Sequence, residues 1–139
     1  MSEYTLTLMP YETLINKVNF LEEDLPFTNG SIGLKYNIYG THAVLTDLGE
    51  CTDSPVVIGG IVCGRNVTTI ESKAFICQRS LTSVVIPGTV TDIKMSAFFG
   101  CTGLTNVYYR GSEEDWATIN IESGNHHLTN ATIHYNSEV

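Results

Sequence analysis

The chain has 139 residues, of which 42% are hydrophobic and 16% charged, and its formal net charge is −8. Its length and apolar content fit a single domain with its own core and argue against wholesale disorder. Seven basic residues stand against 15 acidic ones, without the basic face that a nucleic-acid binder needs. Seventeen Thr, ten Asn and twelve Gly favour short strands and turns over long helices.

The first residues predict neither a signal peptide nor membrane insertion. Residues 1–5 contain no basic segment, and no apolar stretch follows them. No part of the chain approaches the 18 or so consecutive apolar residues that a spanning helix requires.

Residues 12–23 predict an amphipathic helix. Apolar residues recur with the spacing of one helix face at Leu14, Val18, Leu21 and Leu25. Pro10 and Pro26 bound the segment. The same spacing is a two-heptad seam, so the helix either covers one end of the following domain or joins copies of the chain into a homo-oligomer. We therefore divide the chain into an N-terminal helical attachment or capping segment, 1–33, and a main domain, 34–139.

The main domain begins with a predicted hairpin and continues as an internal repeat. Residues 35–39 and 43–45 form the hairpin, turning at Gly40–Thr41. Residues 67–86 align with 90–109 at an offset of 23, with identity at eight of twenty positions. The repeat units are 67–89 and 90–111, preceded by a partial unit at about 56–66. Repetition at this period predicts a solenoid, in which each coil adds a layer of side chains to the previous one.

Alternation within each unit predicts which side chains face the core. Leu81, Val84 and Ile86 occupy inward positions of a short strand, and the next unit has Leu104, Val107 and Tyr109 in the same places. The turn at 96–99 drives an aromatic side chain inward. The outward positions, with the adjacent arginine, form a candidate contact surface because exposed Tyr and Arg are typical of binding sites. This surface comprises Ser83, Val85, Asn106, Tyr108 and Arg110.

The C-terminal part predicts a helix-plus-strand cap. Ser112 is a favourable N-cap, with Asp115 three residues later as a capping-box partner. The helix, at about 113–119, turns Trp116 onto the last coil. A turn at 123–125 leads to a final strand at 131–135.

No residues of the chain form a recognisable catalytic, metal or cofactor site. Cys51, Cys63, Cys77 and Cys101 lack the C-x-x-C spacing of zinc or dithiol sites. Buried free thiols are favoured over two disulfides. His126, His127 and His134 have no ligand partner at metal-binding spacing and are interpreted as solvated loop residues. Nucleophile, metalloprotease and phosphate-loop motifs are absent, so we expect no enzyme.

The repeat units, V-T-x-I-x-x-x-A-F-x-x-C-x-x-L-T-x-V, resemble BspA-like leucine-rich repeats. The resemblance covers about 42–136 and includes the terminal segments 107–116 and 128–135. Gln78 stands where the next unit has Cys101, and Cys77 lies one residue early. The resemblance implies a mainly β solenoid with short helices.

Two functional hypotheses follow from this resemblance. The first is a non-catalytic binding or adhesion module at a bacterial surface that presents its repeats to a protein or surface glycan. The second is a structural subunit of a phage virion, in a tail, baseplate or head fibre, attached or oligomerised through the N-terminal helix. Oligomers would add avidity to a small repeat surface and so combine both hypotheses.

If the helix joins copies of the chain, light scattering should show a dimer or trimer. Replacing Leu14 and Leu21 by Asp places charges in the seam and should convert the oligomer to a monomer. A monomeric wild-type chain would contradict this role.

Overall fold

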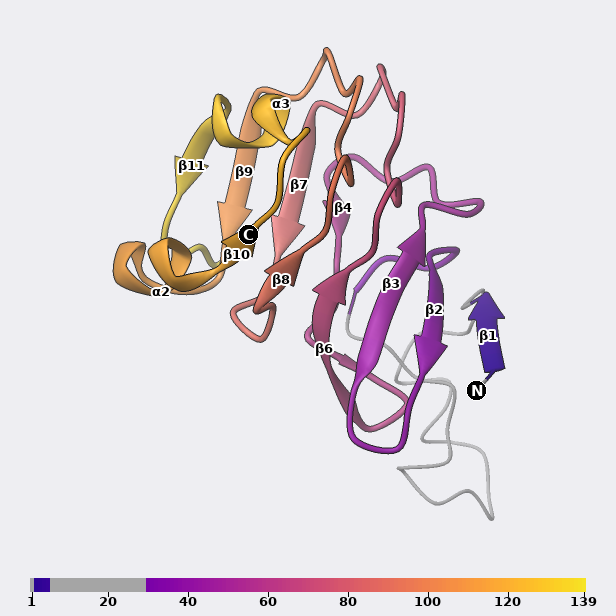
Figure 1. Cartoon of the computed structure of the whole chain (residues 1–139). Coiled ribbons are helices and arrows are strands. Elements are labelled where there is room, and N and C mark those ends of the chain that lie inside the picture. Colours follow the sequence, from indigo (N-terminus) through magenta and orange to yellow (C-terminus); the bar gives the residue numbers. More distant parts are fainter. Residues whose placement is uncertain (1, 6–29) are drawn as a thin grey trace.

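The computed structural model describes residues 2–5 and 30–139, which form two sheets and two short helices (Figure 1). The strands are β1 (Ser2–Thr5), β2 (Lys35–Ile38), β3 (Ala43–Asp47), β4 (Val56–Val57), β5 (Ile61–Val62), β6 (Arg65–Ile70), β7 (Ser83–Ile86), β8 (Asp92–Ile93), β9 (Asn106–Tyr109), β10 (Asn120–Ile121) and β11 (Thr132–His134). The helices are α2 (Glu113–Thr118) and α3 (His126–Thr129). The predicted class, mainly β with few short helices, is confirmed for these residues.

Successive coils contribute parallel strands to each sheet. The larger sheet has the order β1-β2-β3-β6-β8-β10, with β5 also paired to β6, and its strands from β3 to β10 are parallel. The smaller sheet has the order β11-β9-β7-β4 and is parallel throughout. Val84 pairs with Val107 and Val56 with Val84, so the repeat alignment is confirmed.

The core lies between the two sheets and contains the residues that alternation predicted to be inward. Val84, Ile86, Val107 and Tyr109 are buried on the smaller sheet. Phe98 is fully buried and stacks on Phe75 of the preceding coil, with ring centroids 4.9 Å apart. No strand of this length is stable alone, so the contacts between coils provide the burial that holds each strand in place.

The coils differ in the length of chain that connects the two sheets. Equivalent positions on the larger sheet are Leu45, Ile70, Ile93 and Ile121, and those on the smaller sheet are Val56, Val84, Val107 and Ile133. Numbering the coils in this order, the connection between the two positions has 13 residues in the second and third coils, but 10 in the first and 11 in the last. We call these connections corners. The first and last corners are shorter than the middle two, so their backbone cannot take the same path.

The start of the chain contains strands that the sequence did not predict. The predicted hairpin is confirmed as β2 and β3. Strand β1 extends this sheet by antiparallel pairing with β2 and precedes the predicted helix in the sequence. The link at 59–66 forms the β5–β6 hairpin, whose turn places Cys63 and Gly64 at positive φ. The predicted helix at 12–23, with Leu14, Val18, Leu21 and Leu25, lies outside the described residues.

The C-terminal cap is built largely as the sequence predicts. Ser112 caps α2, and the reciprocal capping-box bonds to Asp115 are both present. The helix brings Trp116 against buried Tyr109 in an edge-on contact, with ring centroids 5.0 Å apart. The predicted last strand is confirmed as β11. Strand β10 was not predicted, and together with β11 it adds a further layer in register with both sheets.

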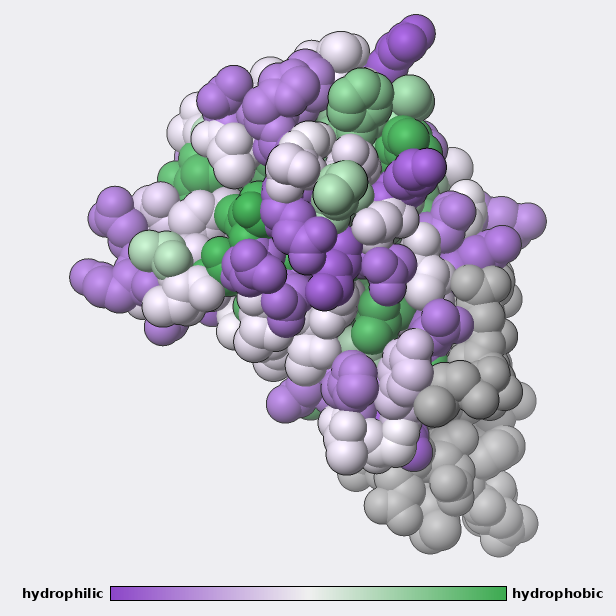
Figure 2. Space-filling model, viewed as in Figure 1, coloured by the Kyte–Doolittle hydropathy of each residue, from purple (hydrophilic) through white to green (hydrophobic). Residues whose placement is uncertain are grey.

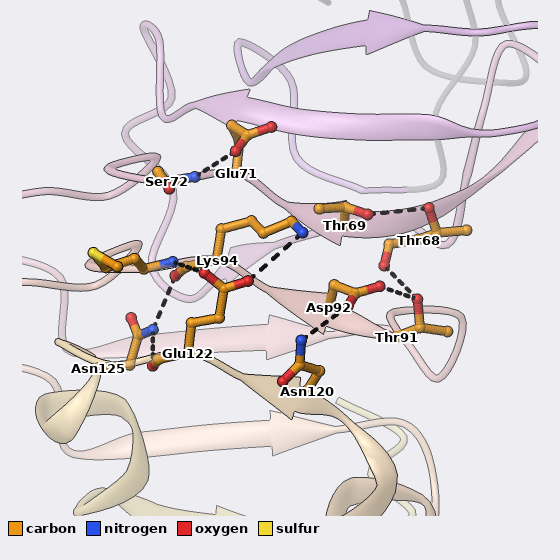
Figure 3. A network of polar contacts seen from close by, with 11 residues as sticks. Thr68, Thr69, Glu71, Ser72, Thr91, Asp92, Lys94, Asn120, Glu122 and Asn125 are labelled. Atoms are coloured by element: carbon orange, nitrogen blue, oxygen red, sulfur yellow. Dashed lines mark hydrogen bonds and ion pairs between the residues drawn. The ribbon is translucent and has the colours of Figure 1, made fainter.

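A side chain replaces a backbone contact where the last corner is short. In the second coil the Phe75 N–H donates to the carbonyl of Ala97, 2.8 Å away. In the third coil the Phe98 N–H instead donates to the side-chain Oδ1 of Asn125, 2.9 Å away. The Asn125 Nδ2 donates to two further backbone carbonyls at 2.9 and 3.0 Å (Figure 3). A buried Asn with all these bonds closes the stack without an unpaired polar group.

Truncation of Phe98 to Ala should lower the free energy of unfolding by roughly 3–5 kcal/mol, because it removes a fully buried aromatic ring. The matched control is Phe99→Ala, since Phe99 is the next residue and 47% exposed, and its effect should stay within about 0.5 kcal/mol. Urea unfolding followed by circular dichroism measures both. A loss below about 1 kcal/mol for Phe98→Ala would contradict the register.

Candidate contact surface

The candidate contact surface lies on the outer face of the smaller sheet. Strands β7 and β9 point their alternate residues into the core, which leaves Ser83, Asn106 and Tyr108 on the opposite face. These three residues are half-buried, and Arg110, which follows β9, is exposed. The burial pattern of β9 alternates as predicted, whereas in β7 only Ser83 is partly accessible.

Val85 does not contribute accessible surface, contrary to the prediction from alternation. It lies on the outer face, between its register partners Val57 and Tyr108, but is fully buried. Alternation predicts the direction of a side chain and not whether neighbouring side chains cover it. The accessible part of the predicted surface is therefore Ser83, Asn106, Tyr108 and Arg110.

His134 joins this surface from the neighbouring strand β11. Its ring stacks on that of Tyr108, with centroids 4.7 Å apart and planes 15° from parallel. Its Nε2 lies 2.9 Å from the Oδ1 of Asn106. The sequence interpretation placed His134 in a solvated loop. The signal that would have found it was the predicted strand at 131–135, whose alternation turns His134 outward beside Tyr108.

Arg110 is held at the edge of the surface by the end of the chain. Its Nη2 and Nε donate to the carbonyl oxygen of Val139 at 2.7 and 3.2 Å. The same tail segment bonds back to the domain, since the Asn136 N–H donates to Gly111 and the Ser137 N–H to Tyr109. The guanidinium is thus oriented, although it remains exposed.

The outer face of the larger sheet is polar and internally paired (Figure 3). Thr91 donates to the Asp92 carboxylate at 2.8 Å, and Asn120 reaches the same carboxylate at 3.4 Å. Lys94 forms an ion pair with Glu122 at 3.6 Å. Exposed pairs of this kind add little stability. Because no aromatic residue takes part in this network, it is a weaker candidate for partner binding than the smaller sheet.

On the visible side of the molecule, the described residues form no large hydrophobic patch (Figure 2). Figure 2 shows a side on which hydrophilic and intermediate residues predominate, with hydrophobic residues in small separate groups. Scattered apolar residues of this kind are normal on a surface and do not mark a hydrophobic interface.

The cysteines are free in the structure and differ in exposure. Cys51 and Cys101 are buried, Cys63 is half-buried and Cys77 is exposed, so the expected burial holds only in part. The Cys101 Sγ donates to the carbonyl of Phe75 at 3.0 Å. Burial raises the pKa of the Cys101 thiol to about 11, which keeps it protonated and unreactive at neutral pH. Burial, and then the nearby Asp115, raises the pKa of Tyr109.

The described residues contain no group of three or more His, Cys, Asp or Glu side chains that would hold a metal ion. Nor does any helix among residues 2–5 and 30–139 have the length and apolar character needed to cross a membrane.

Comparison with family models identifies the repeat. A model described as "BspA type Leucine rich repeat region (6 copies)" matches residues 58–137, more than half of the chain. The chain belongs to the BspA-type leucine-rich repeat family. The resemblance seen in the sequence is therefore confirmed. No curated protein matches the chain.

Solved structures with similar folds are bacterial leucine-rich repeat proteins. A leucine-rich cell surface protein from Faecalibacterium prausnitzii A2-165 is 24% identical, with a TM-score of 0.53, over 78% of this chain and 30% of that one. A leucine-rich repeat protein from Bacteroides capillosus is 18% identical, with a TM-score of 0.51, over 75% and 94%. The T. pallidum leucine-rich repeat protein is 28% identical, with a TM-score of 0.45, over 54% and 40%. The chain thus spans less than half the length of two of these proteins.

Proposed function

We propose that this chain is a non-catalytic binding module that presents the outer face of its smaller sheet to a protein partner. The observation that carries the proposal is the arrangement of Asn106, Tyr108 and His134 on adjacent strands. Members of this repeat family are generally binding modules, and a similar structure is described as a cell surface protein. A surface location is therefore part of the proposal.

The side chains of this face are preorganised for binding. The hydrogen bond that the His134 Nε2 donates to the Asn106 Oδ1, and the stack of His134 on Tyr108, fix these side chains before any partner arrives. Rigid aromatic groups lose little entropy on binding, and oriented Arg and Tyr side chains often carry most of the energy of an interface. The adjacent Arg110 supplies a cation at the edge of this patch.

The size of the face limits the affinity of a single domain. A standard interface buries about 800 Å² on each partner, which would use most of a face built from four short strands. Multivalent display would compensate for weak single contacts. As proposed from the sequence, the N-terminal segment would provide this display. It would either join copies of the chain or attach them to a virion, through Leu14, Val18, Leu21 and Leu25.

The test compares a contact variant with a matched control on printed arrays of extracellular proteins and of glycans. Replacing Tyr108 and Arg110 by Ser should reduce saturable binding to a protein spot at least tenfold, because both proposed anchors are lost. The control is Thr69→Ser on the outer face of the larger sheet, which should bind as wild type does. Thermal unfolding verifies that both variants are folded.

Equal binding by the contact variant and the wild type would contradict the proposed face. Saturable binding to glycan spots alone would contradict a protein partner at this face.

A further inference from the structure

The short first corner leaves a cleft in the stack. The second and third coils each have 13 residues between their two sheet positions, and the first has 10. The first corner still bonds to the second where the Leu48 N–H donates to the Ala74 carbonyl at 3.0 Å, but it provides no acceptor for the Thr82 N–H. A cleft of about 230 Å³ opens between them, on a corner of the solenoid and away from the centre of the smaller sheet.

A column of backbone hydrogen bonds ends at this cleft. The Thr132 N–H donates to the carbonyl of Thr105, and the Thr105 N–H donates to that of Thr82, both at 2.9 Å. The next bond in the column would run from Thr82 to Ser54, the equivalent residue of the first coil. Among the described residues Thr82 donates no such bond. Its N–H is therefore available at the wall of the cleft.

The cleft is lined by polar side chains around an apolar floor. The polar lining consists of Thr52, Asp53, Ser54, Gln78, Ser80 and Thr82, and the apolar lining of Leu48, Cys51, Val56 and Leu81. None of these polar side chains makes a hydrogen bond to another described residue. The wall thus offers three kinds of group that pair with hydroxyls: a carboxylate, an amide and several hydroxyls.

The equivalent place one coil further on is closed. Gly103 occupies the position of Ser80 in the next unit, and a Cβ atom there would lie 2.4 Å from the carbonyl oxygen of Arg79. The third coil thus packs directly on the second at this corner. The repeat itself does not produce the cleft, which follows from the three residues that the first corner lacks.

We propose that this cleft binds one unit of an uncharged saccharide. A sugar hydroxyl both donates and accepts, so it can pair with a wall that mixes Asp53, Gln78 and the Thr82 N–H. The apolar floor, with buried Leu81, can pack against the C–H face of a sugar ring. No Lys or Arg lines the cleft, and a carboxylate at its wall disfavours an anion.

This saccharide site goes beyond the proposed function. The cleft and the Tyr108 face are separate sites, so binding at one can be disproved without disproving binding at the other. The volume lies below the roughly 300–1,000 Å³ of sites for drug-sized ligands, which fits a single small unit. A site this small should bind with a dissociation constant on the order of millimolar.

The test is a titration of the full ¹⁵N-labelled chain with the methyl glycosides of N-acetylglucosamine, galactose, glucose and mannose. At least one glycoside should shift the amide signals of Asp53, Gln78 and Thr82 saturably. The variant Asp53→Ala/Gln78→Ala should weaken the binding at least tenfold. The control Thr102→Ala/Glu138→Ala removes a polar side chain and a carboxylate elsewhere and should bind as wild type does.

A second variant, Ser80→Phe, fills the cleft without removing either polar group and should also abolish the shifts, which keeps the test valid if the double variant fails to fold. Inorganic phosphate and N-acetyl-Ala-Ala-methylamide serve as alternative probes. Saturable shifts at the cleft with phosphate or the peptide alone would overturn the proposal, as would the absence of shifts with all four glycosides up to about 100 mM.

Discussion

The fold depends on the register in which each coil stacks on the next. Parallel strands pair Val56, Val84 and Val107 in one column, and Leu45, Ile70 and Ile93 in another. Both columns stay in register from the first coil to the last, although the chain between them differs in length. A coil of matching length pairs its backbone groups and buries its aromatic layer at once. In a coil of different length, the backbone groups at the corner need other hydrogen-bond partners.

The two ends of the described solenoid meet this constraint differently. The last corner is two residues short, and Asn125 supplies the missing acceptor from its side chain. The first corner is three residues short; it keeps the bond from the Leu48 N–H to the Ala74 carbonyl, but no described residue accepts a bond from the Thr82 N–H. The cleft beside Asp53 and Gln78 follows from that difference. The proposed saccharide site thus belongs to the shortened unit and not to the regular ones.

The sequence predicted the regular part of the fold because equivalent residues recur at one offset. Val84, Val107 and Phe98 are buried as expected, and Ser112 caps its helix. Outside the repeat this signal is lost. The β5–β6 hairpin, α3 and β1 have no second copy with which to be aligned, so local propensity alone had to identify them.

The sequence predicted which way the side chains of the candidate contact surface point, but not which of them are accessible to solvent. Alternation correctly predicted that Tyr108 points outward. It did not predict that Val85 is covered, or that His134 joins the surface from β11, which does not follow the 23-residue offset. The cleft could not be read from the sequence, because it depends on counting the residues between two strands whose ends are visible only in the structure. Each proposed site thus combines a regular coil with an irregular one: Tyr108 with His134 in the contact surface, and Gln78 with Asp53 in the cleft.

Amide hydrogen exchange, measured residue by residue, tests the stacking account most directly. The Thr105 and Thr132 amides, which donate to the preceding coil, should exchange slowly, because only opening of the stack exposes them. The Thr82 amide, at the same position one coil earlier, should exchange much faster. Equal protection of Thr82 and Thr105 would show that the first corner covers the second, and would contradict both the interrupted column and the cleft.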